Sequence, residues 1–162
     1  MAIPRRLLSA QYVGNRQYFL TICTYQRSDY FTCANTVSLT CTQFLQAAER
    51  ESFAISAYCF MPDHVHALVE ACTSGADLRR FVWSAKQCSG YLHRQRTGRR
   101  LWQNSYYDRT LRENQPPMDV IKYIVNNPLR RGLVKSPGEY PYWGSQVYSR
   151  EAILEYIASP AV

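Results

Sequence analysis

The sequence has no long apolar stretch. Its 162 residues contain no run of about 18 or more apolar residues, which is the length that a membrane-spanning helix requires. The opening segment MAIPRRLLSA is charged and lacks the sustained apolar run of a signal peptide. These two absences predict a cytoplasmic protein that does not associate with a membrane.

The cysteines lack a regular arrangement. Six are present, but no two of them form a C-x-x-C pair, and their spacing fits neither a zinc knuckle nor a disulfide framework. We therefore expect them to be reduced and mostly structural. Internal repeats and low-complexity linkers are also absent. With 46% hydrophobic residues, the chain is long enough for one domain with a core and too short for two.

Positive charge is concentrated in one part of the chain. The net charge is +7, and residues 79–135 contain thirteen Lys or Arg but only three acidic residues. Six Trp or Tyr residues lie in the same window. Cations interleaved with flat rings suit single-stranded nucleic acid, whose phosphates need a cationic track and whose bases stack on aromatic rings. The alternative is a solvated basic face with ordinary core aromatics, and composition alone leaves both open.

The residues that we expect to bind nucleic acid are of two kinds. Phosphate contacts are expected from Arg79, Arg80, Lys86, Arg94, Arg96, Arg99, Arg100, Arg130 and Arg131. Bases are expected to contact Trp102, Tyr106 and Tyr107, the N-terminal arm around Arg5 and Arg6, or the tail from Tyr140 to Tyr148. The tail could instead pack against the domain, above all at Tyr142 and Trp143.

Hydrophobic periodicity predicts alternating strands and helices. Strands are expected at 17–25, 53–61, 64–71 and 99–112, and helices at 36–51, 73–96, 114–128 and 151–158. Pro62 and Asp63 favour a hairpin turn, Ser74 is a candidate helix cap, and Pro128 is expected to end its helix. This order predicts an α+β fold, ferredoxin-like in outline, with an antiparallel sheet and helices packed on one face.

The segment MPDHVHALVE, residues 61–70, places two of the three histidines on either side of one valine. In a strand, His64 and His66 point to the same face. Tyr123 and Asn127 are four residues apart and share one face of the helix predicted at 114–128. Two imidazoles and a carboxamide could hold a divalent ion, and the tyrosine could attack a group that the ion polarises.

Each part of this constellation also has an ordinary explanation. An H-x-H pair is more often a hydrogen-bonded pair or an incidental surface feature than a metal site. Tyr123 is one of thirteen tyrosines and could be a plain amphipathic-helix residue. A small zinc hydrolase would need a third strong ligand, which the sequence does not offer, because His93 lies in the basic helix and is expected to face solvent or nucleic acid.

Two segments carry a resemblance to a known family. YCFMPDHVHALVE, followed by LWQNSYYDRTLRENQPPMDVIKYIVNNPLRRGLVKSPGEYPYWGS, resembles the REP-associated tyrosine transposases. These are relatives of insertion-sequence transposases within the HUH (His-hydrophobe-His) single-strand endonucleases. The resemblance covers roughly residues 17–145 and keeps both segments in order and spacing.

The resemblance implies a function and a site. His64 and His66 would bind a catalytic Mg²⁺ or Mn²⁺, Tyr123 would be the nucleophile, and Asn127, where many relatives carry glutamine, would complete the metal site. The substrate would be single-stranded DNA with a palindromic hairpin, cleaved through a 5′-phosphotyrosine intermediate by a monomer or homodimer. Residues 1–135 would form the catalytic part and residues 136–162 a tail of the same domain. The alternative is a binding module on the same fold that no longer cleaves.

Overall fold

The computed structural model describes residues 11–160, so the contacts predicted at Arg5 and Arg6 lie outside the described residues. Its main elements follow in the order β1 (Gln17–Cys23), α1 (Ala34–Arg50), β2 (Phe53–Met61), β3 (His64–Ala71), α2 (Leu78–Thr97), β4 (Tyr107–Thr110), α3 (Pro117–Val125), α4 (Asn127–Arg130), β5 (Trp143–Gly144) and α5 (Arg150–Ala158).

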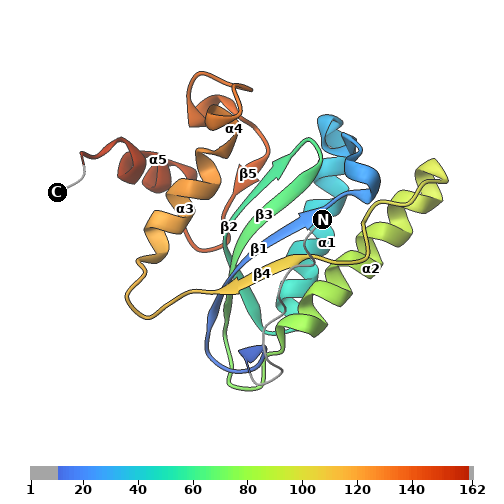
Figure 1. Cartoon of the computed structure of the whole chain (residues 1–162), viewed down its shortest axis with the longest axis horizontal. Coiled ribbons are helices and arrows are strands. Elements are labelled where there is room, and N and C mark those ends of the chain that lie inside the picture. Colours follow the sequence, from blue (N-terminus) through green and yellow to red (C-terminus); the bar gives the residue numbers. More distant parts are fainter. Residues whose placement is uncertain (1–10, 161–162) are drawn as a thin grey trace.

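Five strands form one sheet in the order β4-β1-β3-β2-β5, and every pairing is antiparallel (Figure 1). The predicted turn at Pro62 and Asp63 joins β2 to β3, with Met61 opposite His64. The first four strands and the helices α1 and α2 have the order and sheet positions of a ferredoxin-like unit. The predicted α+β fold with an antiparallel sheet is therefore confirmed.

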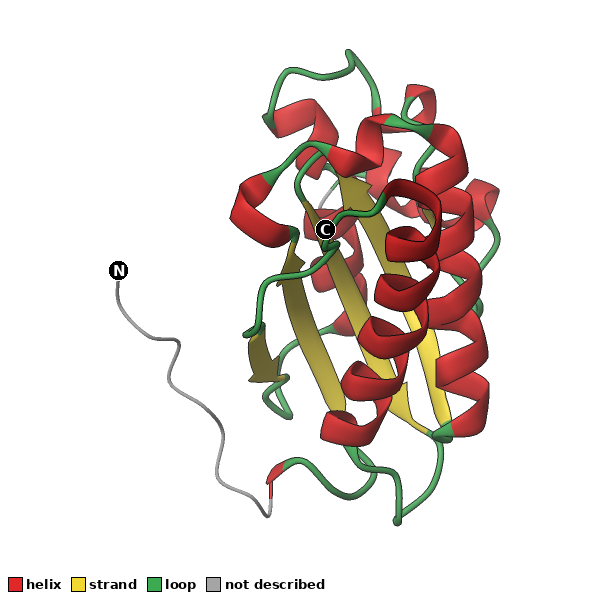
Figure 2. Ribbon diagram, turned by 90° about the vertical axis from the view of Figure 1, so that its right-hand side faces the viewer, coloured by secondary structure: helices red, strands yellow, loops and turns green. Residues whose placement is uncertain are grey.

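Alternation along the central strands sends side chains into two cores. Leu20 and Val65 belong to the core beneath α1 and α2, whereas Phe19 and Leu68 belong to the core beneath α3 and α5. Figure 1 shows α3 and α5 on one side of the sheet and α1 and α2 on the other. In Figure 2, seen from the side of α2, the long helices lie in front of the strands. The prediction of helices on one face is correct for α1 and α2, but helices cover the other face as well. β2 and β3 are accordingly buried on both faces of the sheet.

The helix α2 and the segment after it differ from the prediction in their boundaries. Asp77, not Ser74, caps α2, because its carboxylate accepts a hydrogen bond of 2.9 Å from the N–H of Arg79. The strand predicted at 99–112 is reduced to β4. Before it, Trp102 forms only an isolated bridge with Thr24, and Lys86 Nζ donates to the carbonyls of residues 103 and 104, which fixes this stretch against α2.

The helix predicted at 114–128 is divided in two. α3 ends at Val125, and Pro128 lies in the first turn of α4 instead of ending the helix. Proline has no N–H to donate to the carbonyl four residues earlier, which interrupts the ladder between the two helices. The N–H groups of Arg130 and Arg131 then donate to the carbonyls of Asn126 and Asn127, each at 3.0 Å. The turn that carries Asn127 is thus separate from the helix that carries Tyr123.

The C-terminal tail packs against the domain. β5 pairs with β2, and Trp143 is buried in the second core together with Ile153 of α5. Tyr140 donates a hydrogen bond of 2.6 Å from its hydroxyl to the carbonyl of Phe60. Packing thus holds for Tyr140 and Trp143, whereas Tyr148 is exposed. The six cysteines are free thiols. No helix within residues 11–160 is long and apolar enough to cross a membrane.

Candidate active site

The hairpin of β2 and β3 positions the two histidines. His64 and His66 lie at the start of β3 and point to the face of the sheet that α3 covers, because Val65 between them points into the other core. Both imidazoles are buried, with 4% and 8% of their surface exposed. Their Nε2 atoms are 3.1 Å apart. The prediction that the two rings share one face is confirmed.

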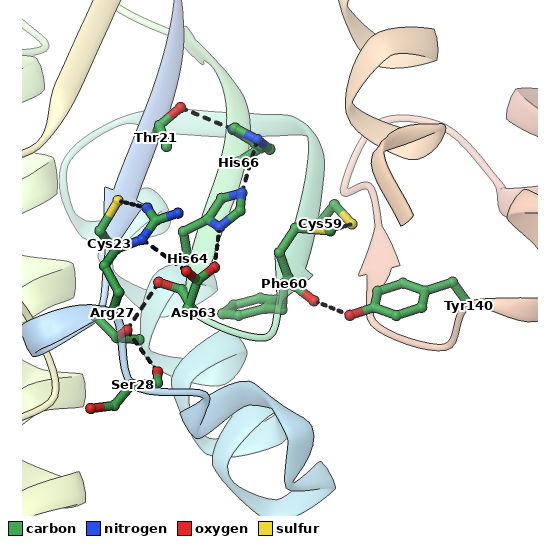
Figure 3. A network of polar contacts seen from close by, with 12 residues as sticks. Thr21, Cys23, Arg27, Ser28, Cys59, Phe60, Asp63, His64, His66 and Tyr140 are labelled. Carbon is green, nitrogen blue, oxygen red and sulfur yellow. Dashed lines mark hydrogen bonds and ion pairs between the residues drawn. The ribbon is translucent and has the colours of Figure 1, made fainter. Parts of the chain in front are cut away.

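Neighbouring side chains hold both rings by their other nitrogen (Figure 3). The Asp63 carboxylate lies 2.6 Å from Nδ1 of His64, and the guanidinium of Arg27 lies 2.8 Å from the same carboxylate. The hydroxyl of Thr21 on β1 lies 2.9 Å from Nδ1 of His66. When Nδ1 of each ring donates its proton to these oxygens, both Nε2 lone pairs point at the same place.

Burial keeps the imidazoles neutral. Desolvation lowers the pKa of His64, although the Asp63 carboxylate opposes that shift. Desolvation and the neighbouring His64 lower the pKa of His66 to about 3. For Asp63 burial acts to raise the pKa, but the hydrogen bond and charge of His64 and the charge of Arg27 outweigh it, so its pKa is lowered. The imidazoles therefore remain available as neutral ligands below the ordinary histidine pKa of about 6.5.

Tyr123 lies on α3 above these histidines. Its ring packs edge-on against Phe19 and His66, with centroids 5.9 and 6.1 Å apart, and 43% of the residue stays exposed. The guanidinium of Arg130 lies over the ring, 4.8 Å from its centre. The phenol thus has fixed neighbours on the protein side and an open side toward solvent.

One cavity collects the predicted catalytic and metal-binding residues. It has a volume of about 320 Å³ and is lined by Thr21, Arg27, His64, His66, Tyr123, Asn127, Arg130 and Arg131. Asn127 comes from the first position of α4 and is 6% exposed. Residues from β1, β3, α3 and α4 therefore meet here, and three arginines give the cavity a positive charge.

The cavity offers three side chains that could bind a metal ion, His64, His66 and Asn127. Among residues 11–160 no cluster of three or more His, Cys, Asp or Glu side chains is placed to hold a metal. The Nε2 atoms of His64 and His66 are close enough for both to bind one ion at about 2.0–2.1 Å. The amide oxygen of Asn127 is a ligand type that Mg²⁺ and Mn²⁺ accept. The donor set fits such an ion, and the metal stays a prediction.

A second cavity adjoins the first on the other side of Tyr123. It measures about 470 Å³, and its lining includes Phe19, Tyr107, Arg109, Gln115 and Asp119. Tyr123, His66 and Thr21 line both cavities. A chain that passes the phenol can therefore extend into a hollow on either side of it.

The residues predicted to bind nucleic acid divide into exposed and buried groups. The nine Lys and Arg residues are all on α2, on the segment that follows it, or on and just after α4, and eight of them are exposed. Arg79 pairs with Asp77 at 2.7 Å, and Arg80 pairs with Glu51 of α1 at 3.3 Å. Among the aromatics Tyr107 is 42% exposed. Its ring lines the second cavity.

Three of the predicted surface roles were wrong. Trp102 and Tyr106 are buried at 4% and 7% exposure, so neither ring offers a face to a base. The indole N–H of Trp102 donates to Ser89 at 2.9 Å. His93 is also buried, at 4% exposure, against the ring of Tyr30. These side chains lie between α2 and the rest of the domain, where hydrophobic packing accounts for them.

Sequence analysis missed the groups that orient the histidines. Asp63 was interpreted only as a turn residue, although a carboxylate directly before the H-x-H pair could have pointed to this contact. Arg27 reaches Asp63 from the segment after β1, where Gln26 and Arg27 have positive φ angles of 54° and 56°. That conformation leaves no signal in the sequence, because both residues ordinarily avoid it.

Comparison with known proteins identifies related chains. Residues 12–127 match the family described as Transposase IS200 like. A protein of Haemophilus influenzae, named as a REP-associated tyrosine transposase, is 23% identical over 137 residues, which cover 77% of each chain.

Two solved structures share the fold. A REP-associated tyrosine transposase bound to a REP hairpin matches with a TM-score of 0.71 and 19% identity, over 88% of this chain and 82% of that one. A transposase structure from Deinococcus radiodurans matches with a TM-score of 0.54 and 23% identity, over 78% and 97%. Because the family match extends over more than half of its length, the chain belongs to the IS200-like transposase family, as the resemblance had predicted.

Proposed function

We propose that this protein cleaves and rejoins single-stranded DNA at REP-like palindromic hairpins, with Tyr123 as its nucleophile. The observation that carries the proposal is the single cavity that His64, His66, Tyr123 and Asn127 line together. A protein that only binds DNA has no use for a phenol beside two neutral imidazoles. The hairpin bound by the structural relative supports the choice of substrate.

The proposed reaction conserves the phosphodiester bond energy. The phenol of Tyr123 gives its proton to water and its oxygen attacks the phosphorus, the bond from phosphorus to the 3′ oxygen breaks, and that oxygen takes up a proton from water as it leaves. The 5′ phosphate is then esterified to Tyr123 and a 3′ hydroxyl is free. Attack by a 3′ hydroxyl on the phosphotyrosine reverses these steps, so strands can be joined without ATP.

The chain supplies positive charge around the reacting phosphate. Arg27, Arg130 and Arg131 line the cavity and can interact with the non-bridging oxygens, where negative charge increases in the transition state. The contact of Arg130 with the ring of Tyr123 holds the phenol beside that charge. A divalent ion bound by His64, His66 and Asn127 would add further positive charge at the same oxygens.

The position of the phenol favours Tyr123 over other tyrosines. Tyr123 packs against His66 and lines both cavities, whereas the exposed Tyr107 lines only the second one. A nucleophile must lie in line with the bond that it breaks. A DNA strand that runs from one cavity to the other has to pass Tyr123, because Tyr123 lies between them.

The experiment that tests the proposal uses a labelled single-stranded hairpin with unpaired flanks, incubated with the protein and Mg²⁺ or Mn²⁺. We expect a covalent adduct on denaturing gels that is absent in Tyr123→Phe, while Tyr107→Phe, the matched control at an exposed tyrosine nearby, still forms it. Both variants should keep DNA affinity, because each loses one oxygen. Hairpin binding without any adduct would indicate a binding module that no longer cleaves.

A further inference from the structure

A larger hollow lies on the opposite side of the sheet from the catalytic cavity. It measures about 740 Å³ and lies between α2 and residues 100–106, with no lining residue in common with the cavity around Tyr123. α2 packs on the face that carries Val65, whereas His64 and His66 point to the other face. We call this hollow the α2 groove, lined among others by Arg79, Trp83, Lys86, Tyr91, Arg94 and Arg100.

Two aromatic rings in this groove are unusually accessible. Trp83 is 67% exposed and Tyr91 is 63% exposed, more than any other large hydrophobic residue between residues 11 and 160. They are eight residues apart with Gln87 midway, so they lie on one face of α2, about 12 Å apart along its axis. Exposing two such rings costs hydration free energy, and a partner that stacks on them removes that cost.

The groove around these rings is lined by basic side chains and, within residues 11–160, by no Asp or Glu. Lys86 donates to the carbonyls of residues 103 and 104 at 2.8 and 3.1 Å, and Arg100 donates to the carbonyl of Trp102 at 2.8 Å. These carbonyl contacts hold both cations beside the groove. Arg79 pairs with Asp77, and Arg94 and Arg100 are exposed.

We propose that the α2 groove binds unpaired nucleotides of the DNA substrate, with bases stacked on Trp83 and Tyr91 and phosphates near Arg94 and Arg100. A single strand has both required features, a negative charge per nucleotide and a flat face on each base. The inference rests on the proposed function for the identity of the nucleic acid. It adds a second contact with the substrate, on the face of the sheet opposite the cleavage centre.

The fluorescence of the protein gives a direct test. Of the three tryptophans, Trp102 and Trp143 are 4% and 2% exposed, so Trp83 alone is open to a stacking base. Titration with a short oligothymidylate should quench the emission, and Trp83→Phe should abolish the quenching while retaining most of the affinity. Trp83→Ala and Tyr91→Ala should each weaken binding at least about fivefold, the lower range for one base–aromatic stack.

A pair of arginine variants separates the groove from the rest of α2. Arg94→Ala should reduce the salt dependence of binding by about 0.7 in log–log slope, the change for one lost phosphate contact on a single strand. Arg80→Ala is the matched control, because Arg80 is an exposed arginine of the same helix that pairs with Glu51 and does not line the groove. A midpoint temperature of thermal unfolding equal to that of the wild type would show that these surface variants remain folded.

The result that overturns the inference is unchanged oligothymidylate affinity in both Trp83→Ala and Tyr91→Ala, with no quenching in the wild type. Quenching by polyglutamate but not by DNA would also overturn it, since the groove would then bind acidic peptide. The proposed cleavage is tested separately by covalent adduct at saturating DNA. A wild type that forms no adduct would refute Tyr123 as the nucleophile without changing the fluorescence result.

Discussion

The contact between Asp63 and His64 leads to a quantitative prediction about metal binding. The carboxylate lies 2.6 Å from Nδ1 of His64, so it fixes the ring and directs Nε2 toward His66. Asp63→Asn keeps the shape of the side chain but removes the charge. Loss of such a partner typically costs 10- to 100-fold in metal affinity, about 1.4–2.8 kcal/mol, and we expect the affinity for Mn²⁺ to fall by that factor.

The backbone at this turn allows the substitution without loss of the fold. The carbonyl of Asp63 accepts hydrogen bonds from the backbone N–H and the hydroxyl of Thr24, at 3.0 and 2.9 Å, and neither involves the carboxylate. Isothermal titration calorimetry with Mn²⁺ measures the affinity directly, with no need for DNA cleavage. Asp29→Asn is the matched control, because Asp29 is an exposed aspartate whose carboxylate forms no hydrogen bond or ion pair with His64 or His66. Wild-type affinity in Asp63→Asn, or an equal loss in Asp29→Asn, would refute the orienting role.

Two further predictions concern stability. Trp102→Ala should lower the free energy of unfolding by about 3–5 kcal/mol, because Trp102 packs against Phe31 and Phe44; a loss under about 1 kcal/mol in urea unfolding would contradict its place in the core. With EDTA present to remove metal, the free energy of unfolding of the wild type should fall as the pH drops from about 6.5 toward 3. His66 contributes at most about 1.4 kcal/mol per pH unit to this fall. The reason is that His66 takes up a proton near pH 6.5 in the unfolded chain, but only near its pKa of about 3 in the folded protein. His66→Gln should flatten this profile, and an equally steep one in that variant would contradict the burial of a neutral His66.

Much of the fold could be predicted because local patterns dominate it. Alternation around His64 and the Pro62–Asp63 turn identified the central hairpin, and helical spacing identified α1 and α2 within a few residues. The break between α3 and α4 could not be predicted in the same way. Pro128 is compatible with both the end of one helix and the start of another, and only packing of the following turn decides between them.

The candidate site also has features that the sequence predicts and features that it does not. The spacing of His64, His66, Tyr123 and Asn127 made them candidates and the family resemblance implied their roles, and the structure brings them to one cavity. Exposure of individual aromatics was not predictable, because residue type does not tell which side of a helix or segment faces the core. Trp102 was expected at the surface and is buried, whereas the exposed ring is that of Trp83.

The measurement that tests the central claim most directly is the location of the covalent bond. After reaction of the wild type with a hairpin substrate and Mn²⁺, nuclease and protease digestion followed by tandem mass spectrometry identifies the residue that carries the 5′ phosphate. The geometry of the cavity predicts a phosphotyrosine on the peptide that contains Tyr123 and an unmodified peptide at Tyr107. A nucleotide attached to Tyr107 or to any other residue would contradict the assignment of Tyr123 as nucleophile.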